Sequence, residues 1–170
     1  MKRILVTGAN RGIGLELCRR LNERGDEVIA VCRHTSKALG QLNLRVFDGV
    51  DVSDESSIRK LQGDLGIRTI DWLINNAGIL SVESLENLDF DAMERQFRVN
   101  TLGPLRVTAG LLENLSDNAK VGIITSRMGS IEDNTSGGYY GYRVSKAAVN
   151  MVGKCLALDL QSRGISVALL

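Results

Sequence analysis

The stretch Thr7-Gly8-Ala9-Asn10-Arg11-Gly12-Ile13-Gly14 (TGANRGIG) directly follows the apolar run RILVT at residues 3–7. A glycine triplet between a strand and a helix is the context in which such a turn binds a dinucleotide. Gly8 would allow a sharp turn, Gly12 would let backbone approach a pyrophosphate, and Gly14 would let the helix pack closely on the sheet. The helix N-terminus offers free N–H groups and a positive dipole end to phosphates. We therefore predict a dinucleotide site, with an ordinary glycine turn as the alternative.

Outward from this turn, short apolar runs alternate with longer amphipathic segments, which predicts strands alternating with helices. The pattern indicates an α/β fold, a Rossmann-type doubly wound parallel sheet of about six strands with helices on both faces. The only proline, Pro104, predicts a kink or break in the helix around it. All elements belong to one domain, residues 1–170, with expected strands at residues 3–7, 27–32, 44–47, 70–75, 120–125 and 165–170, and expected helices at residues 12–24, 53–65, 90–115 and 142–163.

Composition limits the class of protein. Apolar residues make up 44% and charged residues 24%, which is typical of a globular domain with a sizeable core. The net charge of +1 argues against nucleic acid as a partner. No apolar stretch approaches about 18 residues, so we expect no membrane partner and a cytoplasmic location. The three cysteines and the single histidine, His34, share no metal-ligand spacing, which argues against a metal site or a Cys/His nucleophile.

The second expected strand carries information about the cofactor. An Asp or Glu at its end usually binds a free ribose 2′-hydroxyl. Here the strand ends in Cys32-Arg33-His34, without a carboxylate. Arg33, together with Arg11 in the glycine turn, could instead pair with a 2′-phosphate, because guanidinium groups suit phosphate geometry. We therefore predict a preference for NADPH, with NADH as the alternative cofactor; two solvated surface arginines are the other interpretation.

All three tyrosines of the chain lie within the stretch GGYYGYRVSK, residues 137–146. A phenol has a pKa near 10, so it is a poor acid–base catalyst at neutral pH unless its anion is stabilised. A lysine four residues further along a helix can provide that stabilisation. Only Tyr142 has a lysine at this spacing, Lys146, whereas Tyr139 is followed by Arg143 and Tyr140 by Val144. Tyr142 is therefore the candidate proton donor.

These features occur together in one known family. The chain resembles the short-chain dehydrogenase/reductases, which combine Thr-Gly-x-x-x-Gly-x-Gly with Tyr-x-x-x-Lys. The motifs appear in the family's order along essentially the whole chain. Within the family, SRMGSIEDN and GGYYGYRVSKAAVN are similar to the C-factor or sniffer-type carbonyl reductases. The matching motifs are TGANRGIG at residues 7–14, Asp51-Val52, NNAG at residues 75–78, Asn100 to Gly103, a serine after the fifth strand, and YRVSK at residues 142–146.

The resemblance implies a role for each matching residue. Ser126 would polarise a substrate carbonyl, and Tyr142 would donate the proton as hydride arrives from the nicotinamide. Lys146 would lower the pKa of Tyr142 and bind the nicotinamide ribose, and Asn100 would stabilise a water that relays protons toward Lys146. The substrate would be a small-molecule carbonyl or alcohol. The implied cofactor-binding residues are Gly8, Asn10, Arg11, Gly12, Ile13, Gly14, Arg33, Asp51, Val52, Asn76, Ala77, Gly78, Tyr142 and Lys146.

Two departures from the family pattern affect the expected site. Ser126 precedes Tyr142 by more residues than is usual in the family, so residues 130–138 would form an extra loop, with Ser130 as the fallback for the serine. The sequence ends at Leu170, where family members continue into a last strand and a substrate lid. We therefore expect a C-terminally incomplete domain.

Two functions remain open at this point. The first is an NADPH-dependent carbonyl reductase. The alternative is a weakly active or inactive dinucleotide-binding remnant that acts by pairing with a full-length relative. Family members build dimers from helices that correspond to residues 90–115 and 142–163, so a homodimer through these helices is also expected.

Overall fold

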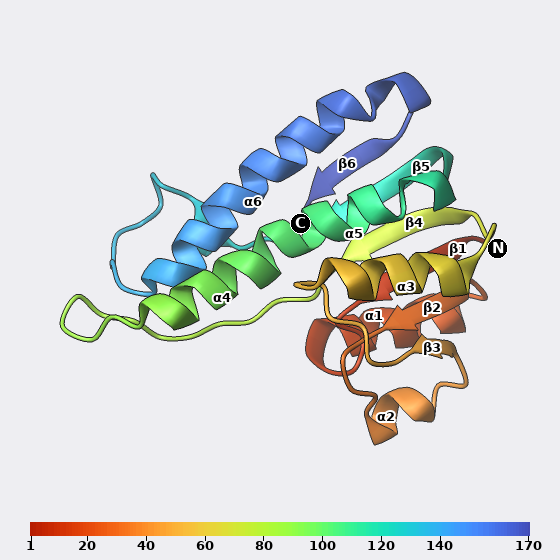
Figure 1. The fold of residues 1–170 in the computed structure, drawn as a ribbon, viewed down its shortest axis with the longest axis horizontal. Coiled ribbons are helices and arrows are strands. Elements are labelled where there is room, and N and C mark those ends of the chain that lie inside the picture. The colour runs from red at the N-terminus through yellow and green to blue at the C-terminus, as the bar shows by residue number, and fades with distance from the viewer.

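The computed structural model describes all residues from 1 to 170 and contains one six-stranded parallel sheet (Figure 1). The strand order is β3-β2-β1-β4-β5-β6. The first three strands are added toward one edge of the sheet and the last three toward the other, so the strand order reverses between β1 and β4. The doubly wound Rossmann-type sheet predicted from the sequence is confirmed. The strands are β1 (Arg3–Thr7), β2 (Glu27–Val31), β3 (Arg45–Phe47), β4 (Ile70–Asn75), β5 (Leu115–Ile123) and β6 (Ser166–Leu169).

Helices cover both faces of this sheet. They are α1 (Gly12–Glu23), α2 (Lys37–Gly40), α3 (Glu55–Leu65), α4 (Phe90–Asn100), α5 (Leu102–Gly110) and α6 (Tyr140–Asp159), with short 3-10 turns η1 (Leu112–Asn114), η2 (Arg127–Gly129) and η3 (Gln161–Arg163).

Strands β1 and β2 contribute buried residues to two hydrophobic cores, because successive side chains point to opposite faces. Leu5 of β1 belongs to the larger core, which includes buried residues of α3, α5 and α6. Its neighbour Ile4 belongs to the smaller core, which includes buried residues of α1 and α2. This double burial is the physical reason for the nearly continuous apolar character of β1 and β2.

The helix expected at residues 90–115, with a kink or break near Pro104, is broken into the two helices α4 and α5. The break comes at Thr101, and Pro104 lies in the first turn of α5, where a missing N–H removes no intrahelical hydrogen bond. The fifth strand also begins and ends earlier than expected, at Leu115 and Ile123. The helix carrying Tyr142 starts two residues early, at Tyr140, and the short helix α2 was not predicted.

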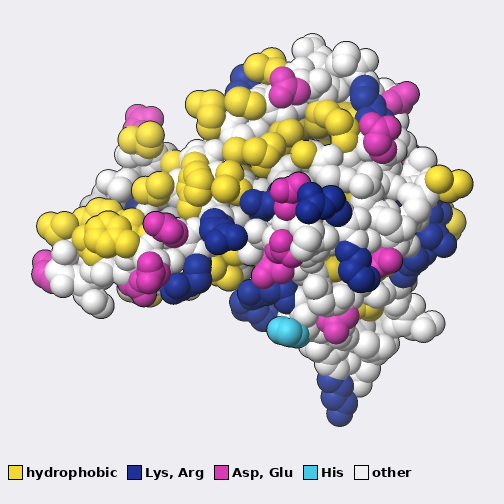
Figure 2. Space-filling view, viewed as in Figure 1, with side chains coloured by type: hydrophobic (Ala, Val, Ile, Leu, Met, Phe, Trp, Pro, Cys, Tyr) yellow, Lys and Arg dark blue, Asp and Glu magenta, His cyan; other side chains and the backbone are white.

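Some apolar side chains lie outside the two cores. Figure 2 shows hydrophobic side chains gathered over α4 and α6. On α6, Val144, Met151 and Leu158 follow one another at seven-residue intervals and are exposed, as are Phe90 and Phe97 of α4. We call these five residues the apolar stripe. None of the helices combines the length and the apolar character needed to cross a bilayer.

The glycine turn after β1 packs directly against the loop after β4. Gly8 has a φ of +66°, and a Cβ added to it would lie 2.8 Å from Cα of Ala77. A Cβ on Gly14 would overlap the carbonyl oxygen of Gly8 and Nδ2 of Asn76. The side-chain amide of Asn76 donates to the carbonyl oxygens of Thr7 and Gly8, at 3.0 and 3.1 Å. These contacts fix the start of α1 against the two central strands.

We predict that Gly14→Ala lowers the free energy of unfolding by about 1–3 kcal/mol, because its methyl group overpacks this contact. The matched control is Gly63→Ala in α3, where an added Cβ meets nothing within 4 Å. The control should be more stable by about 0.5–1 kcal/mol, because alanine restricts the unfolded chain and favours helix. Chemical denaturation measures both values. Equal stability of the two variants would contradict the tight packing at Gly14.

Candidate functional site

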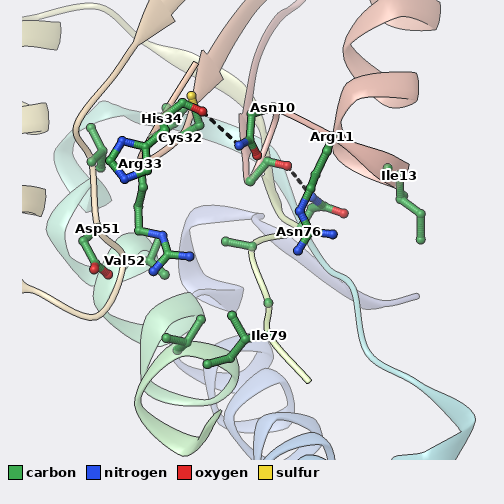
Figure 3. Close-up of a pocket in the computed structure, with 17 residues that line it drawn as sticks. Asn10, Arg11, Ile13, Cys32, Arg33, His34, Asp51, Val52, Asn76 and Ile79 are labelled. Carbon is green, nitrogen blue, oxygen red and sulfur yellow. Dashed lines mark hydrogen bonds between the residues drawn. The ribbon is translucent and has the colours of Figure 1, made fainter. Parts of the chain in front are cut away.

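A cleft of about 300 Å³ opens at the carboxyl ends of the first four strands (Figure 3). It includes the point between β1 and β4 where the strand order reverses, which is where ligands bind in open α/β sheets. Its walls come from the glycine turn after β1, the residues that follow β2 and β3, and the loop after β4.

Most of the residues predicted to bind a cofactor line this cleft. They are Gly8, Asn10, Arg11, Gly12, Ile13, Arg33, Asp51, Val52, Asn76, Ala77 and Gly78. Gly14 lies behind the glycine turn, and Tyr142 and Lys146 do not line the cleft. Sequence reasoning missed six lining residues: Val31 at the end of β2, Cys32 and His34 after it, Val50 and Ile79 in the loops after β3 and β4, and Val99 in α4. For all of them except Val99, a position at or shortly after the carboxyl end of a strand was the available signal.

The first turn of α1 has N–H groups without a capping side chain. Arg11 precedes this helix in extended conformation, and its side chain makes no capping hydrogen bond. The first turn of α1 also contains no acidic residue. The first N–H groups of a helix have no intrahelical acceptor, so this end of the cleft attracts anions.

The two arginines lie on opposite sides of the cleft. Figure 3 shows Arg33 extending into the cleft beside Asp51, whereas Arg11 lies next to Asn76. Neither arginine forms a salt bridge. Asn10 connects the two sides, because its Nδ2 donates to the carbonyl oxygen of His34 at 2.9 Å. The cleft therefore presents two guanidinium groups without acidic partners.

A polar link joins the glycine turn to the loop after β4. The hydroxyl oxygen of Thr7 accepts hydrogen bonds from the backbone N–H groups of Asn76 and Ala77, both at 3.1 Å. On the other side, Oδ1 of Asp51 accepts from the backbone N–H and the hydroxyl of Ser53, at 2.8 and 2.7 Å. Both walls of the cleft are thus fixed by hydrogen bonds within the chain.

Tyr142 and Lys146 lie one turn apart on α6. The ammonium nitrogen of Lys146 is 5.6 Å from the centroid of the Tyr142 ring, and it donates to the carbonyl oxygen of Ile124 at 2.8 Å. Lys146 is only 5% exposed. This burial lowers the pKa of Lys146, because removal from water disfavours its charged form.

Asn100 lies beside this pair. Its Nδ2 donates to the carbonyl oxygen of Ile79 and to the hydroxyl of Ser145, and its Oδ1 accepts from the N–H of Ile79. A Cβ added to Gly78 would lie 3.3 Å from Oδ1 of Asn100 and 4.0 Å from the nitrogen of Lys146. Gly78 therefore connects the cleft to the Tyr–Lys pair.

The two candidate serines lie at the two ends of η2. Ser126 precedes it, and its hydroxyl oxygen accepts from the N–H of Met128 at 3.1 Å. Ser130 follows it, and its hydroxyl accepts from the N–H of Asp133 in the extra loop. A Cβ on Gly129 would lie 2.8 Å from the backbone of Lys146, so η2 packs directly on α6.

The reversed strand order, the glycine turn and the neighbouring Tyr–Lys pair define a dinucleotide-binding oxidoreductase domain. The chain belongs to the short-chain dehydrogenase family, whose model matches residues 2–170. The resemblance drawn from the sequence motifs is thereby confirmed.

Individual members of the family are similar to this chain in sequence or in structure. The chain is 43% identical to 1-hydroxy-2-glutathionyl-2-methyl-3-butene dehydrogenase of Rhodococcus sp. (strain AD45), over all of this chain and 76% of that protein. It is 46% identical to C-signal of Myxococcus xanthus, over 59% of this chain and 63% of that protein. The NADPH-bound carbonyl reductase from chicken fatty liver superimposes with a TM-score of 0.87 at 30% identity, over 99% of this chain and 78% of that one.

Proposed function

We propose that this chain transfers hydride between NADPH and a small-molecule carbonyl or alcohol, with Tyr142 as the acid–base group. NADH is the alternative cofactor. The observation that carries the proposal is the pair Tyr142 and Lys146 beside a glycine-lined cleft, joined to it through Gly78. The similarity to an NADPH-bound carbonyl reductase supports the choice of cofactor and reaction.

The residues of the cleft fit a dinucleotide phosphate. The glycine turn leaves room for a ligand, since a Cβ on Gly12 would meet nothing within 4 Å, and the adjacent start of α1 offers N–H donors to a pyrophosphate. Arg33 would pair with a 2′-phosphate, and Arg11, on the opposite side of the cleft beside Asn76, would add positive charge to the cleft. When bound, the nicotinamide supplies or accepts the hydride. The adenine and its ribose would contact the remaining predicted residues, Asn10, Asp51, Val52, Asn76, Ala77 and Gly78.

Lys146 is suited to serve both a ribose and the phenol of Tyr142. An ammonium group has three N–H donors, and only one of them is used within the chain, toward Ile124. The two others would donate to a ribose hydroxyl and to the phenol oxygen. Because Lys146 is buried, its positive charge is poorly screened and acts more strongly on the phenol than it would in water.

Besides Lys146, the proton transfer would involve Tyr142, Ser126 and Asn100. Tyr142 would give its proton to the alkoxide that develops as the carbonyl is reduced. The Ser126 oxygen already accepts from Met128, which leaves its hydroxyl hydrogen to donate to the substrate oxygen. Two fixed donors at one oxygen stabilise the charge that develops there. Asn100 would support the water that relays protons to Lys146.

Tyr142→Phe should lower NADPH-dependent carbonyl reduction at least about a hundredfold, because it removes the general acid. Binding of NADPH, measured by fluorescence titration, should stay unchanged. Tyr140→Phe is the matched control, since it removes an exposed phenol at the start of the same helix. Retained turnover in Tyr142→Phe would exclude Tyr142 as the acid. Tight NADPH binding by the unmodified chain without any turnover would support the alternative, a dinucleotide-binding remnant.

Arg33→Ala should weaken NADPH binding about tenfold to a hundredfold, which is the typical effect of losing one charge-assisted hydrogen bond. Binding of NADH should change little, because NADH lacks the 2′-phosphate. Arg59→Ala on α3 controls for net charge, since Arg59 is exposed and pairs only with Glu55. Fluorescence titration with both nucleotides measures the effect. Equal losses for the two nucleotides would remove Arg33 from cofactor selection.

We further propose that the chain forms a homodimer through the apolar stripe on α4 and α6. Met151, at 64% exposure, lies in the middle of the α6 part of the stripe, and exposed apolar side chains gathered on one face are typical of an interface. Met151→Glu should therefore shift the protein to monomers in analytical ultracentrifugation. Ile67→Glu, which changes an exposed apolar residue outside the stripe, should not. A monomeric unmodified chain would contradict the proposal.

A further inference from the structure

Glu83 is a buried carboxylate in the loop between β4 and α4. It is 2% exposed, and it forms no salt bridge. Its Oε1 accepts hydrogen bonds from the hydroxyl of Ser81 and from Nε2 of Gln96, the latter at 2.8 Å. Gln96, which is fully buried on α4, also accepts from the backbone N–H of Ser81. A buried acidic group with only neutral partners is costly, so its position calls for a physical reason.

The second oxygen of Glu83 contacts the start of α6. Its Oε2 accepts from the N–H of Gly141 at 3.2 Å, and the backbone carbonyl of Glu83 accepts from the N–H of Tyr139 at 2.8 Å. The residue before α6, Tyr139, has a φ of +53° and makes no side-chain capping bond. Glu83, 58 residues away in the sequence, therefore caps the N-terminus of α6 in place of a neighbouring residue. Its negative charge is also stabilised there by the positive end of the helix dipole.

The same contacts determine how α6 meets α4. A Cβ on Gly141 would overlap Nε2 of Gln96 and lie 2.9 Å from Cγ of Met93, so the two helices touch at this point. Tyr142 is the next residue of this turn, and Lys146 follows one turn later. Any shift of the first turn of α6 therefore moves the phenol relative to the cleft.

We propose that Glu83 is a positioning residue for Tyr142, which it fixes by capping α6 and by its hydrogen bond to Gln96. The inference rests on the proposed function for its catalytic consequence. Its structural part, the attachment of the first turn of α6 to Glu83, can be tested without any measurement of turnover.

Glu83→Gln tests the proposal without changing the size of the side chain. One of its two terminal positions becomes an NH₂ group, which would face either the NH₂ of Gln96 or the N–H of Gly141. The exchange of partners, Glu83→Gln with Gln96→Glu, restores one donor and one acceptor across the pair. Glu86→Gln is the control, since Glu86 lies exposed in the same loop without a hydrogen-bond partner.

Two measurements report the effect. In Glu83→Gln, amide hydrogen exchange of residues 139–146 should accelerate about fivefold, as expected when a helix cap is lost, while the rest of the chain is unchanged. The kcat for carbonyl reduction should fall about tenfold to a hundredfold, because a small displacement of a catalytic group has effects of this size. The dissociation constant of NADPH should change by less than about twofold, since Glu83 does not line the cleft and Lys146 keeps its separate hydrogen bond to Ile124.

The exchanged pair should recover most of both properties, and Glu86→Gln should match the unmodified chain. Unchanged exchange at residues 139–146 in Glu83→Gln would overturn the proposal, whether or not the unmodified chain is active. A parallel loss of kcat, NADPH binding and exchange protection throughout the chain would also overturn it, because it would show a general structural role. Absence of turnover in the unmodified chain would refute the proposed function instead, and hydrogen exchange would still decide the attachment of α6 by Glu83.

Discussion

The closeness of the glycine turn to the loop after β4 is the constraint on which the site depends. A side chain at position 14 would collide with the carbonyl oxygen of Gly8 and with the side-chain amide of Asn76. That amide lies against the turn and donates to the carbonyl oxygens of Thr7 and Gly8. Because β1 and β4 are neighbours at the reversal of the strand order, this contact brings two loops together from distant parts of the sequence. The start of α1 then faces the cleft, where its free N–H groups are available to an anion.

A second set of buried polar contacts holds α6, which carries Tyr142 and Lys146, against α4 and the loop after β4. Lys146 is anchored on the carbonyl of Ile124, Asn100 links Ile79 to Ser145, and Glu83 binds the start of α6. Each of these groups would be costly to bury without its partners. Because all of these groups form their hydrogen bonds only in this arrangement, the contacts define how α4, α6 and the loop after β4 pack together. Gly78 lies where the two sets of contacts meet, with Asn100 and Lys146 on one side and the cleft on the other.

The sequence predicted most of the sheet because its strands carry short apolar runs, and in β1 and β2 burial on both faces makes these runs nearly continuous. It predicted the break near Pro104 but located it poorly, since a proline is tolerated in the first turn of a helix. The start of β5 at Leu115 was missed, because its polar residues 116–118 lack the apolar run that marks a strand. The residues around the cleft were predicted where a motif marks them and missed where only a strand end does, as at His34 and Ile79.

By itself, the sequence determined the features that depend on short spacings: the glycine turn, the absence of a carboxylate after β2, and the four-residue interval from Tyr142 to Lys146. Local geometry translates such spacings directly into chemistry, because neighbouring residues share a turn or one face of a helix. Only the tertiary structure decided that Gly78 lies beside Lys146 and that Glu83 caps α6 from 58 residues away. These contacts join residues far apart in the chain, and they form only after the sheet and the packing of α4 on α6 bring those residues together.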